Sequence, residues 1–186
     1  MLTSVRSGKR IAITGASGVG KTTLAERLSV ELDLPLIPEM ARQLCQERGY
    51  SRIGDIRDQE GFKRQVLSGQ MEAEEQHGSF VSDRPAIDCW VLWQRWNICS
   101  AMTYDSESYY ELCCSQATSY THVIYIPPLF AAVDDAFRWT EADYQKQIDR
   151  IVRMTLFDFG LLERTWTIKT VSVEERAEEV VLWLKK

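Results

Sequence analysis

The sequence predicts an α/β fold in which helices cover a five-stranded parallel sheet. Short apolar segments of strand-like composition alternate along the chain with longer segments whose apolar residues recur at helical spacing. The first apolar segment also runs through a glycine-rich turn into a helical pattern, which is the order of elements in a βα unit. Parallel strands need such crossover helices, so the alternation favours helices on both faces of the sheet.

Five segments have the composition of strands: residues 10–14, 34–38, 79–83, 122–126 and 167–171. The segments between and after them are expected to form helices: residues 20–33, 40–49, 59–76, 86–100, 107–119, 143–160 and 174–185. The first helix carries Leu24, Leu28 and Leu32 at helical spacing. Residues 127–142 fit neither pattern, and we expect a short lid there, because long loops in such domains often close over ligands.

Length and composition restrict the classes of protein to consider. The 186 residues fit one domain with a sizeable core, so residues 1–186 are expected to form a single domain. The net charge is −5 and no block of Lys and Arg accompanies the aromatic residues, which argues against nucleic-acid binding. The chain contains no apolar run of about 18 residues and no signal-peptide pattern, so we expect no membrane insertion and a cytoplasmic location.

The cysteines form no pattern of a disulfide framework or a zinc site, because no C-x-x-C pair occurs among them. They are Cys45, Cys89, Cys99, Cys113 and Cys114. We expect all five to be reduced thiols in the core.

Residues 15–22, GASGVGKT, form a complete G-x-x-x-x-G-K-T phosphate-binding loop between the first strand and the first helix. Its glycines let backbone N–H groups turn toward phosphate oxygens and approach them closely. Lys21 is expected to reach the β- and γ-phosphates, the Thr22 hydroxyl to coordinate Mg²⁺, and the helix N-terminus to attract the same anion. The expected nucleotide-binding residues are Gly15, Ala16, Ser17, Gly18, Val19, Gly20, Lys21, Thr22 and Thr23. The loop predicts binding of a nucleoside triphosphate.

Charged residues follow the second and third predicted strands, where ligands of a parallel sheet bind. Asp83 stands where a carboxylate would hold Mg²⁺ or accept a proton from the attacking hydroxyl; alternatively, it caps the next helix. Arg84 offers a planar fork for phosphate oxygens, with a surface salt bridge as the alternative. Glu39 is a candidate general base, or it serves only to start the helix that follows.

Two further groups of residues are candidates for the same site. Arg138, in the expected lid, could close over the transferring phosphoryl group, or it is simply solvated. Trp90, Trp93 and Trp96 recur every three residues after Asp83, and we favour core packing for them over an aromatic wall that stacks a planar ring of the substrate.

Four segments together resemble a known family. Residues 13–24 (ITGASGVGKTTL), 38–42 (PEMAR), 82–84 (SDR) and 133–138 (VDDAFR) are similar to AAA_28-type P-loop domains. These domains are similar to the ribosylnicotinamide-kinase domain of bacterial NAD-synthesis regulators and, more distantly, to deoxynucleoside kinases. The resemblance implies a three-layer P-loop NTPase fold with kinase-type strand order 2-3-1-4-5. Adenine is then expected near residues 171–173, by analogy with related kinases.

The resemblance also implies an activity, namely ATP-dependent transfer of a phosphoryl group to a hydroxyl or phosphate of a nucleoside-like or nucleotide-like molecule. Thr22 and Asp83 would then hold Mg²⁺, Asp83 or Glu39 would be the base, and Arg84 and Arg138 would contact phosphates. The expected cofactors are ATP and Mg²⁺, and the expected partner is that small molecule, with a homodimer left open.

Two other classes of P-loop protein remain as alternatives. A P-loop ATPase commonly has a water-activating Glu directly after the Walker B Asp, and here Arg84 occupies that position. A GTP-dependent regulatory protein would have an Asn-Lys-x-Asp guanine-binding motif, which the sequence lacks. We therefore predict a P-loop small-molecule kinase, with an ATPase or a nucleotide-dependent regulatory protein as the alternative.

Overall fold

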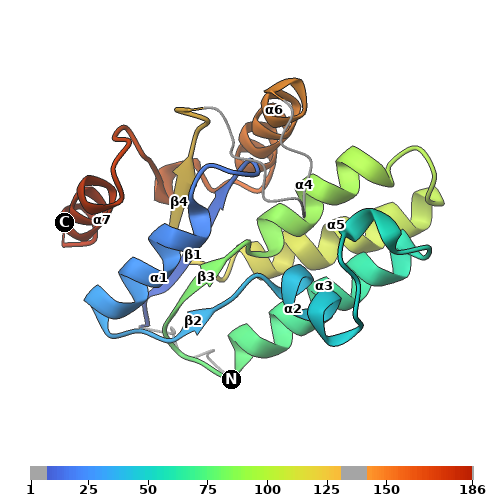
Figure 1. Ribbon diagram of the computed structural model, residues 1–186, viewed down its shortest axis with the longest axis horizontal. Helices are drawn as coiled ribbons and strands as arrows, with labels where there is room; N and C mark the ends of the chain where they lie inside the picture. The colour runs from blue at the N-terminus through green and yellow to red at the C-terminus, as the bar shows by residue number, and fades with distance from the viewer. Residues whose placement is uncertain (1–7, 131–141, 186) are drawn as a thin grey trace.

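The structure, a computed structural model, describes residues 8–130 and 142–185 and contains a five-stranded sheet in the order β2-β3-β1-β4-β5 (Figure 1). The strands are β1 (Arg10–Gly15), β2 (Leu36–Ile37), β3 (Phe80–Asp83), β4 (His122–Ile126) and β5 (Thr165–Thr167). All neighbouring strands pair in parallel. The predicted fold class and the predicted strand order are therefore confirmed.

Helices cover both faces of this sheet and complete three layers. They are α1 (Lys21–Leu32), α2 (Met40–Glu47), α3 (Gln59–Glu75), α4 (Ala86–Trp96), α5 (Thr103–Ala117), α6 (Ala142–Asp158) and α7 (Val173–Trp183), with short 3₁₀ helices η1 (Ile53–Asp55) and η2 (Leu162–Arg164). Helices α1 and α7 contact each other on one face, while α4 and α6 pack on the other, with α3 and α5 against α4 (Figure 1). No described helix is long and apolar enough to cross a bilayer.

Three predicted boundaries are wrong by four residues each. Strand β5 ends at Thr167 rather than continuing to residue 171, because the chain turns toward α7, where the Thr170 hydroxyl donates to Glu179 at 3.2 Å. Helix α4 ends at Trp96, and residues 97–101 form turns in which the Ala101 amide donates to the Asn97 carbonyl at 2.8 Å. Helix α5 begins at Thr103, four residues earlier than expected.

The core lies on both sides of the two central strands. All six residues of β1 are buried, as are four of the five residues of β4. Trp93 is fully buried and stacks on Tyr109 with ring centroids 4.1 Å apart, and Trp90 is also buried. Core packing is thus confirmed for these two tryptophans, but Trp96 is 37% exposed.

The five cysteines are free thiols, as predicted, but not all of them lie in the core. Cys45, Cys89 and Cys113 are buried. Cys114 is half-buried and Cys99 is exposed, because Cys99 lies in the turn after α4 rather than in a continued helix. The expectation that all five belong to the core is therefore wrong for Cys99, while Cys114 packs against the edge of the core.

A buried polar cluster fixes the end of β3 and the start of α4. The Ser82 hydroxyl donates to Glu74 at 2.9 Å, and the Tyr120 hydroxyl donates to the same oxygen at 3.1 Å. The Tyr120 oxygen also accepts from the Ala86 amide at 3.0 Å, so the first turn of α4 is tied to α3 and to the turn before β4. Burial raises the Tyr120 pKa well above its usual value, and Glu74 raises it further, so this phenol stays protonated as a donor.

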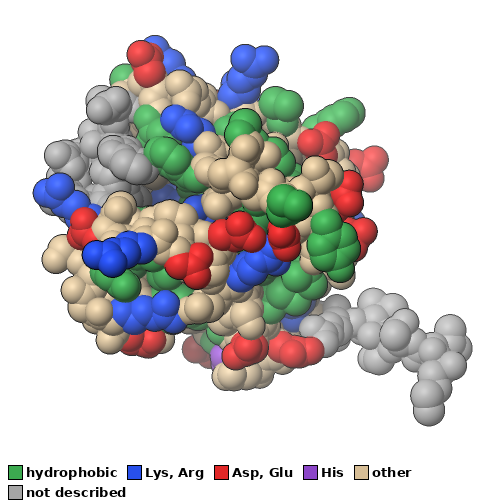
Figure 2. Space-filling view, turned by 90° about the vertical axis from the view of Figure 1, so that its right-hand side faces the viewer, with side chains coloured by type: hydrophobic (Ala, Val, Ile, Leu, Met, Phe, Trp, Pro, Cys, Tyr) green, Lys and Arg blue, Asp and Glu red, His purple; other side chains and the backbone are tan. Residues whose placement is uncertain are grey.

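The surface shows no extended area of one charge on the face in Figure 2, where basic and acidic side chains are interspersed. This pattern matches the chain's small net charge of −5 and differs from the basic stripe of a nucleic-acid-binding face.

Candidate active site

The phosphate-binding loop joins β1 to α1 in a conformation that requires glycine. Gly15, Gly18 and Gly20 have φ of +149°, +74° and +88°. A Cβ at Gly15 would also lie 2.4 Å from the carbonyl oxygen of Ile126, far inside contact distance. The loop is therefore pressed against the end of β4, and the N-terminus of α1 at Lys21 faces the same region.

Lys21 lies inside this loop. Its side chain is buried, and its ammonium group donates to the carbonyl oxygens of Gly15 at 2.7 Å and Ala16 at 2.5 Å. The ammonium group is thus held beside the loop in which phosphates are expected to bind.

Asp83 meets the loop because β3 pairs with β1, with Asp83 opposite Ile13. Its Oδ2 accepts a hydrogen bond from the Thr22 hydroxyl at 2.6 Å. Its Oδ1 is buried and makes no hydrogen bond with the described residues. The first helical turn of α4 is capped at Pro85 without a side-chain bond, so the helix-capping alternative for Asp83 is wrong. A hydroxyl and a carboxylate oxygen in contact suit Mg²⁺, which prefers oxygen ligands.

Arg84 is at the centre of a buried ion-pair cluster and not in a surface salt bridge. Its Nε lies 3.0 Å from Glu39 Oε1, its Nη1 lies 3.5 Å from Asp88 Oδ1, and its Nη2 donates to Ser17 Oγ at 3.3 Å. Burial alone would lower the Arg84 pKa, but the carboxylates of Glu39 and Asp88 more than offset this and raise it. One guanidinium group therefore joins the phosphate-binding loop to two carboxylates.

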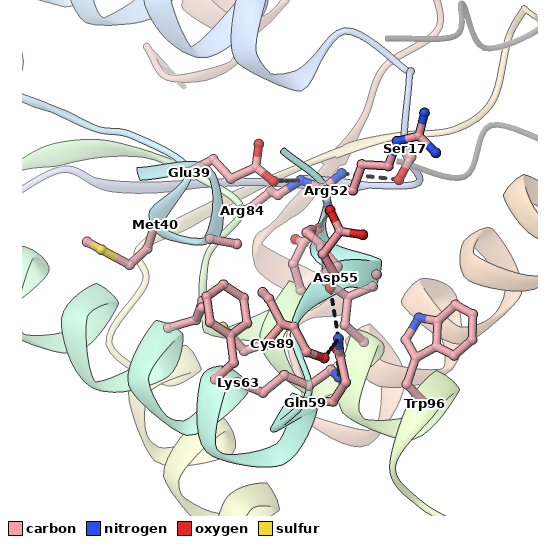
Figure 3. A pocket seen from close by; sticks show the side chains of 18 of the residues that line it. Ser17, Glu39, Met40, Arg52, Asp55, Gln59, Lys63, Arg84, Cys89 and Trp96 are labelled. Atoms are coloured by element: carbon pink, nitrogen blue, oxygen red, sulfur yellow. Dashed lines mark hydrogen bonds and ion pairs between the residues drawn. The ribbon is translucent and has the colours of Figure 1, made fainter. Parts of the chain in front are cut away.

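The backbone of Arg84 is strained. Its φ of +58° is in the left-handed region, which a bulky residue rarely adopts and which costs about 1–3 kcal/mol. This turn between β3 and Pro85 directs the side chain toward Ser17 and Glu39 (Figure 3). We infer that the ion pairs of the Arg84 side chain stabilise this strained backbone conformation.

Glu39 and Asp88 are the two carboxylates of the cluster. Glu39 precedes α2 and is buried, and its side chain makes no capping bond to that helix, although its Oε2 lies 3.7 Å from Arg42 Nε. Asp88, in the first turn of α4, is 3% exposed. Burial raises the Asp88 pKa, while the positive charges of Lys21 and Arg84 oppose that effect.

A pocket of about 720 Å³ opens beside this cluster (Figure 3). Ser17, Glu39 and Arg84 line one side, and most of the other lining residues come from η1, α3 and α4, with further ones from α2, α5 and α6. Aromatic side chains contribute to its wall, namely Phe62, Trp96, Tyr109 and Tyr144. Of the three tryptophans, Trp96 lines this pocket, where the alternative of an aromatic wall stays a prediction; its ring centroid lies 6.0 Å from that of Tyr144.

The C-terminal segment also touches the phosphate-binding loop. Arg176 of α7 is buried, and its Nη1 donates to the Val19 carbonyl at 2.7 Å while its Nε donates to the Thr170 carbonyl at 3.0 Å. Arg176 thus connects the loop to Thr170, the residue directly before the segment 171–173 that is expected to contact adenine.

The structure brings together Lys21, Thr22, Asp83, Glu39 and Arg84 at the carboxyl ends of β1, β2 and β3. Arg138 and most of the expected lid lie outside the described residues. Sequence reasoning missed Asp88, and its separation of four residues from Arg84 gives no helical ion-pair signal, because Arg84 precedes α4. It also missed Lys63 and Gln59 of the pocket wall and Arg176, which follow no motif.

The sequence profile of the AAA_28 family, described as an AAA domain, matches residues 10–176. The chain belongs to the AAA_28 family. No protein among the curated sequences matches it.

Solved structures with the same fold as this AAA_28 domain are nucleotide-binding proteins and kinases. NadR in complex with NAD and AMP-PNP superposes with a TM-score of 0.75 at 18% identity, covering 96% of this chain and 50% of that one. Deoxyadenosine kinase from M. mycoides, with products dCMP and dCDP bound, gives 0.64 at 14% identity, covering 94% and 98%. Shikimate kinase from Aquifex aeolicus gives 0.60 at 16% identity, covering 95% and 96%. This chain spans about half the length of the NadR structures. The AAA_28 domain thus has a kinase-like P-loop fold.

Proposed function

We propose that this AAA_28 domain is an ATP-dependent kinase that transfers the γ-phosphoryl group to a small nucleoside-like or nucleotide-like molecule. The main support for this proposal is that the pocket lies directly beside the phosphate-binding loop. The carboxylates of Glu39 and Asp88 line it, and Ser17 of the phosphate-binding loop closes the same end. A donor and an acceptor bound on the two sides of Ser17 would meet there.

In the donor half, the loop N–H groups, Lys21 and the N-terminus of α1 bind the triphosphate. The Thr22 hydroxyl and Asp83, which are already in contact, would hold Mg²⁺, and the unpartnered Oδ1 of Asp83 offers it a further ligand. Bound there, the ion would neutralise charge on the phosphate oxygens. The described lining of the pocket includes Glu39 and Asp88 but not Asp83, which favours the metal-binding role for Asp83 over the role of base.

In the acceptor half, Glu39 orients the acceptor hydroxyl and takes its proton. The hydroxyl oxygen forms a bond to the γ-phosphorus, the bond from that phosphorus to the β–γ bridging oxygen breaks, and ADP leaves. Arg84, between the loop and the pocket, stabilises charge on the phosphoryl oxygens. We also propose that Arg138, in the expected lid, stabilises charge on the phosphoryl oxygens.

The size and lining of the pocket favour a nucleoside-like acceptor. A volume of about 720 Å³ is within the usual range for small-molecule sites, and the aromatic side chains suit a flat ring. The structurally similar proteins include a deoxyadenosine kinase and a shikimate kinase. Arg84 stands where an ATPase would carry a water-activating Glu, so the kinase is favoured over an ATPase without an acceptor.

The test is transfer of radioactive phosphate from γ-labelled ATP to a panel of nucleosides, nucleotides and hydroxylated small molecules. We expect a labelled product and ATP turnover that rises with acceptor. ATP turnover equally fast without any acceptor would contradict the proposal.

Four variants separate the roles of these residues. Lys21→Ala is expected to weaken ATP binding and abolish transfer, because it removes the charge beside the loop. Asp83→Asn and Glu39→Gln are expected to keep ATP binding and lose at least about a hundredfold in turnover. If Asp88→Asn lost turnover while Glu39→Gln did not, the base would be Asp88.

A further inference from the structure

Lys63 places a buried cation in the acceptor pocket, away from the phosphate-binding loop. It comes from α3, is 9% exposed and lines the pocket. Figure 3 shows Lys63 and Gln59 on the side of the pocket opposite to Ser17, Glu39 and Arg84. This ammonium group has no role in the proposed phosphoryl transfer.

The ammonium group has no counter-ion among the described residues. Its one hydrogen-bond partner there is the neutral Oε1 of Gln59, at 3.4 Å. The Gln59 nitrogen donates to the carbonyls of Ile53 and Ile56, both at 2.8 Å, so this amide group is fixed with its oxygen toward Lys63. Glu60, the other polar neighbour on α3, is in range to raise the Lys63 pKa but pairs with Arg64 at 3.4 Å.

A buried ammonium group without a counter-ion is costly. Burial accordingly lowers the Lys63 pKa from 10.5 to about 8, although the charge of Glu60 acts to raise it. A ligand that supplied an anionic oxygen would remove that cost and form a charge-assisted hydrogen bond.

We propose that Lys63 binds an oxyanion of the acceptor, so that the acceptor is a hydroxyl compound with a carboxylate or phosphate group remote from the hydroxyl that receives the phosphoryl group. This inference rests on the proposed kinase function and narrows its substrate class.

The charged groups at the two ends of the pocket favour one orientation of the acceptor; Arg52 and Asp55, which also line the pocket, carry opposite charges. At the loop end, the carboxylates of Glu39 and Asp88 share Arg84, so a further anion there meets two negative charges. At the opposite end, Lys63 meets the neutral Gln59. The hydroxyl of the acceptor therefore faces Glu39 and its oxyanion faces Lys63, with Phe62 and Trp96 available to contact a ring between them.

The test measures binding, by titration calorimetry, of compounds that differ only in the remote group. One series is benzyl alcohol, 4-(hydroxymethyl)benzoate and 4-(hydroxymethyl)phenyl phosphate; a second pair is uridine and orotidine. The protein is the full chain, saturated with a non-hydrolysable ATP analogue. The benzoate and phosphate arms separate a carboxylate from a phosphate as the preferred oxyanion.

We expect an anionic member to bind at least about tenfold more tightly than its neutral counterpart. Lys63→Met is expected to abolish this preference and Lys63→Arg to retain most of it. The matched control is Lys9→Met, which removes an exposed lysine before the amino end of β1 and should leave the preference unchanged. Equal affinities, undetectable binding of all three anionic compounds, or a preference that survives Lys63→Met would overturn the inference.

The two proposals fail in different ways. Tight, Lys63-dependent binding of an anionic compound with no phosphoryl transfer to any acceptor would contradict the kinase function and leave the oxyanion site standing. Transfer to neutral acceptors in preference to anionic ones would contradict the oxyanion site alone.

Discussion

Replacing Lys63 by Met should stabilise the ligand-free protein. Burial lowers the Lys63 pKa from 10.5 to about 8, and each pH unit of difference corresponds to about 1.4 kcal/mol. At pH 7 the charged side chain therefore costs about 3 kcal/mol of folding free energy, and a methionine would remove this cost while preserving most of the apolar stem. The lost hydrogen bond to Gln59 is long, 3.4 Å, and offsets little of the gain.

The stability difference between Lys63→Met and the wild type should decrease as the pH rises. Between about pH 8 and pH 10.5 the unfolded chain binds a proton at Lys63 that the folded chain does not, so the Lys63 contribution to wild-type stability rises with pH across this window. The advantage of Lys63→Met is thus full below pH 8, smaller at pH 9.5 and absent above pH 10.5.

Urea unfolding at pH 7 and pH 9.5, followed by tryptophan fluorescence, measures both quantities. Lys9→Met is the control and should change the free energy of unfolding by no more than about 0.5 kcal/mol at either pH. A Lys63→Met variant less stable than the wild type at pH 7, or a stability difference equal at both pH values, would refute the reasoning. Stability gained at the expense of ligand binding is the usual sign of a functional residue.

Two further variants test the loop and the ion-pair cluster. Gly15→Ala should lower the free energy of unfolding by more than about 2 kcal/mol, because its Cβ would overlap a carbonyl of β4 at a φ of +149°. Gly78→Ala, where a Cβ meets no atom within 4 Å, is its control in thermal denaturation, and equal losses in both would contradict the steric argument. Arg84→Met should cost about 3–5 kcal/mol in urea unfolding, since Glu39 and Asp88 lose their shared cation. A variant as stable as the wild type would show that these ion pairs contribute little to folding.

The parts of this fold that sequence reasoning predicted are those set by local chemistry. The phosphate-binding loop needs glycines at fixed spacing, and parallel pairing produces the alternation of apolar and helical segments, so the parallel sheet and the positions of Lys21 and Thr22 were predictable from the residues. The strand order was predicted from the family resemblance. Thr22 and Asp83 were predicted to hold one Mg²⁺, and their contact agrees with that expectation: Asp83 ends β3, while Thr22 follows the loop that leaves the neighbouring strand β1.

The parts that it missed depend on tertiary packing. Lys63 has the spacing of an ordinary helix residue, and only the packing of α3 beside α4 turns it toward the pocket. The end of β5 was misplaced because residues 168–171 have a strand-like composition, while hydrogen bonds from α7 to Thr170 stop the strand. Arg84 was expected to contact phosphates, but no local pattern indicates its two buried carboxylate partners together.

The buried position of Arg84 makes the two halves of the site thermodynamically dependent on each other. One guanidinium group holds Ser17 of the loop on one side and Glu39 of the pocket on the other, so a ligand that draws it toward either side changes the free energy of binding at the other. Linkage requires this effect to be reciprocal: whatever factor the nucleotide imposes on acceptor affinity, the acceptor imposes on nucleotide affinity. We therefore expect the order in which the two ligands are added to leave the total binding free energy unchanged, while each affinity depends on whether the other ligand is bound.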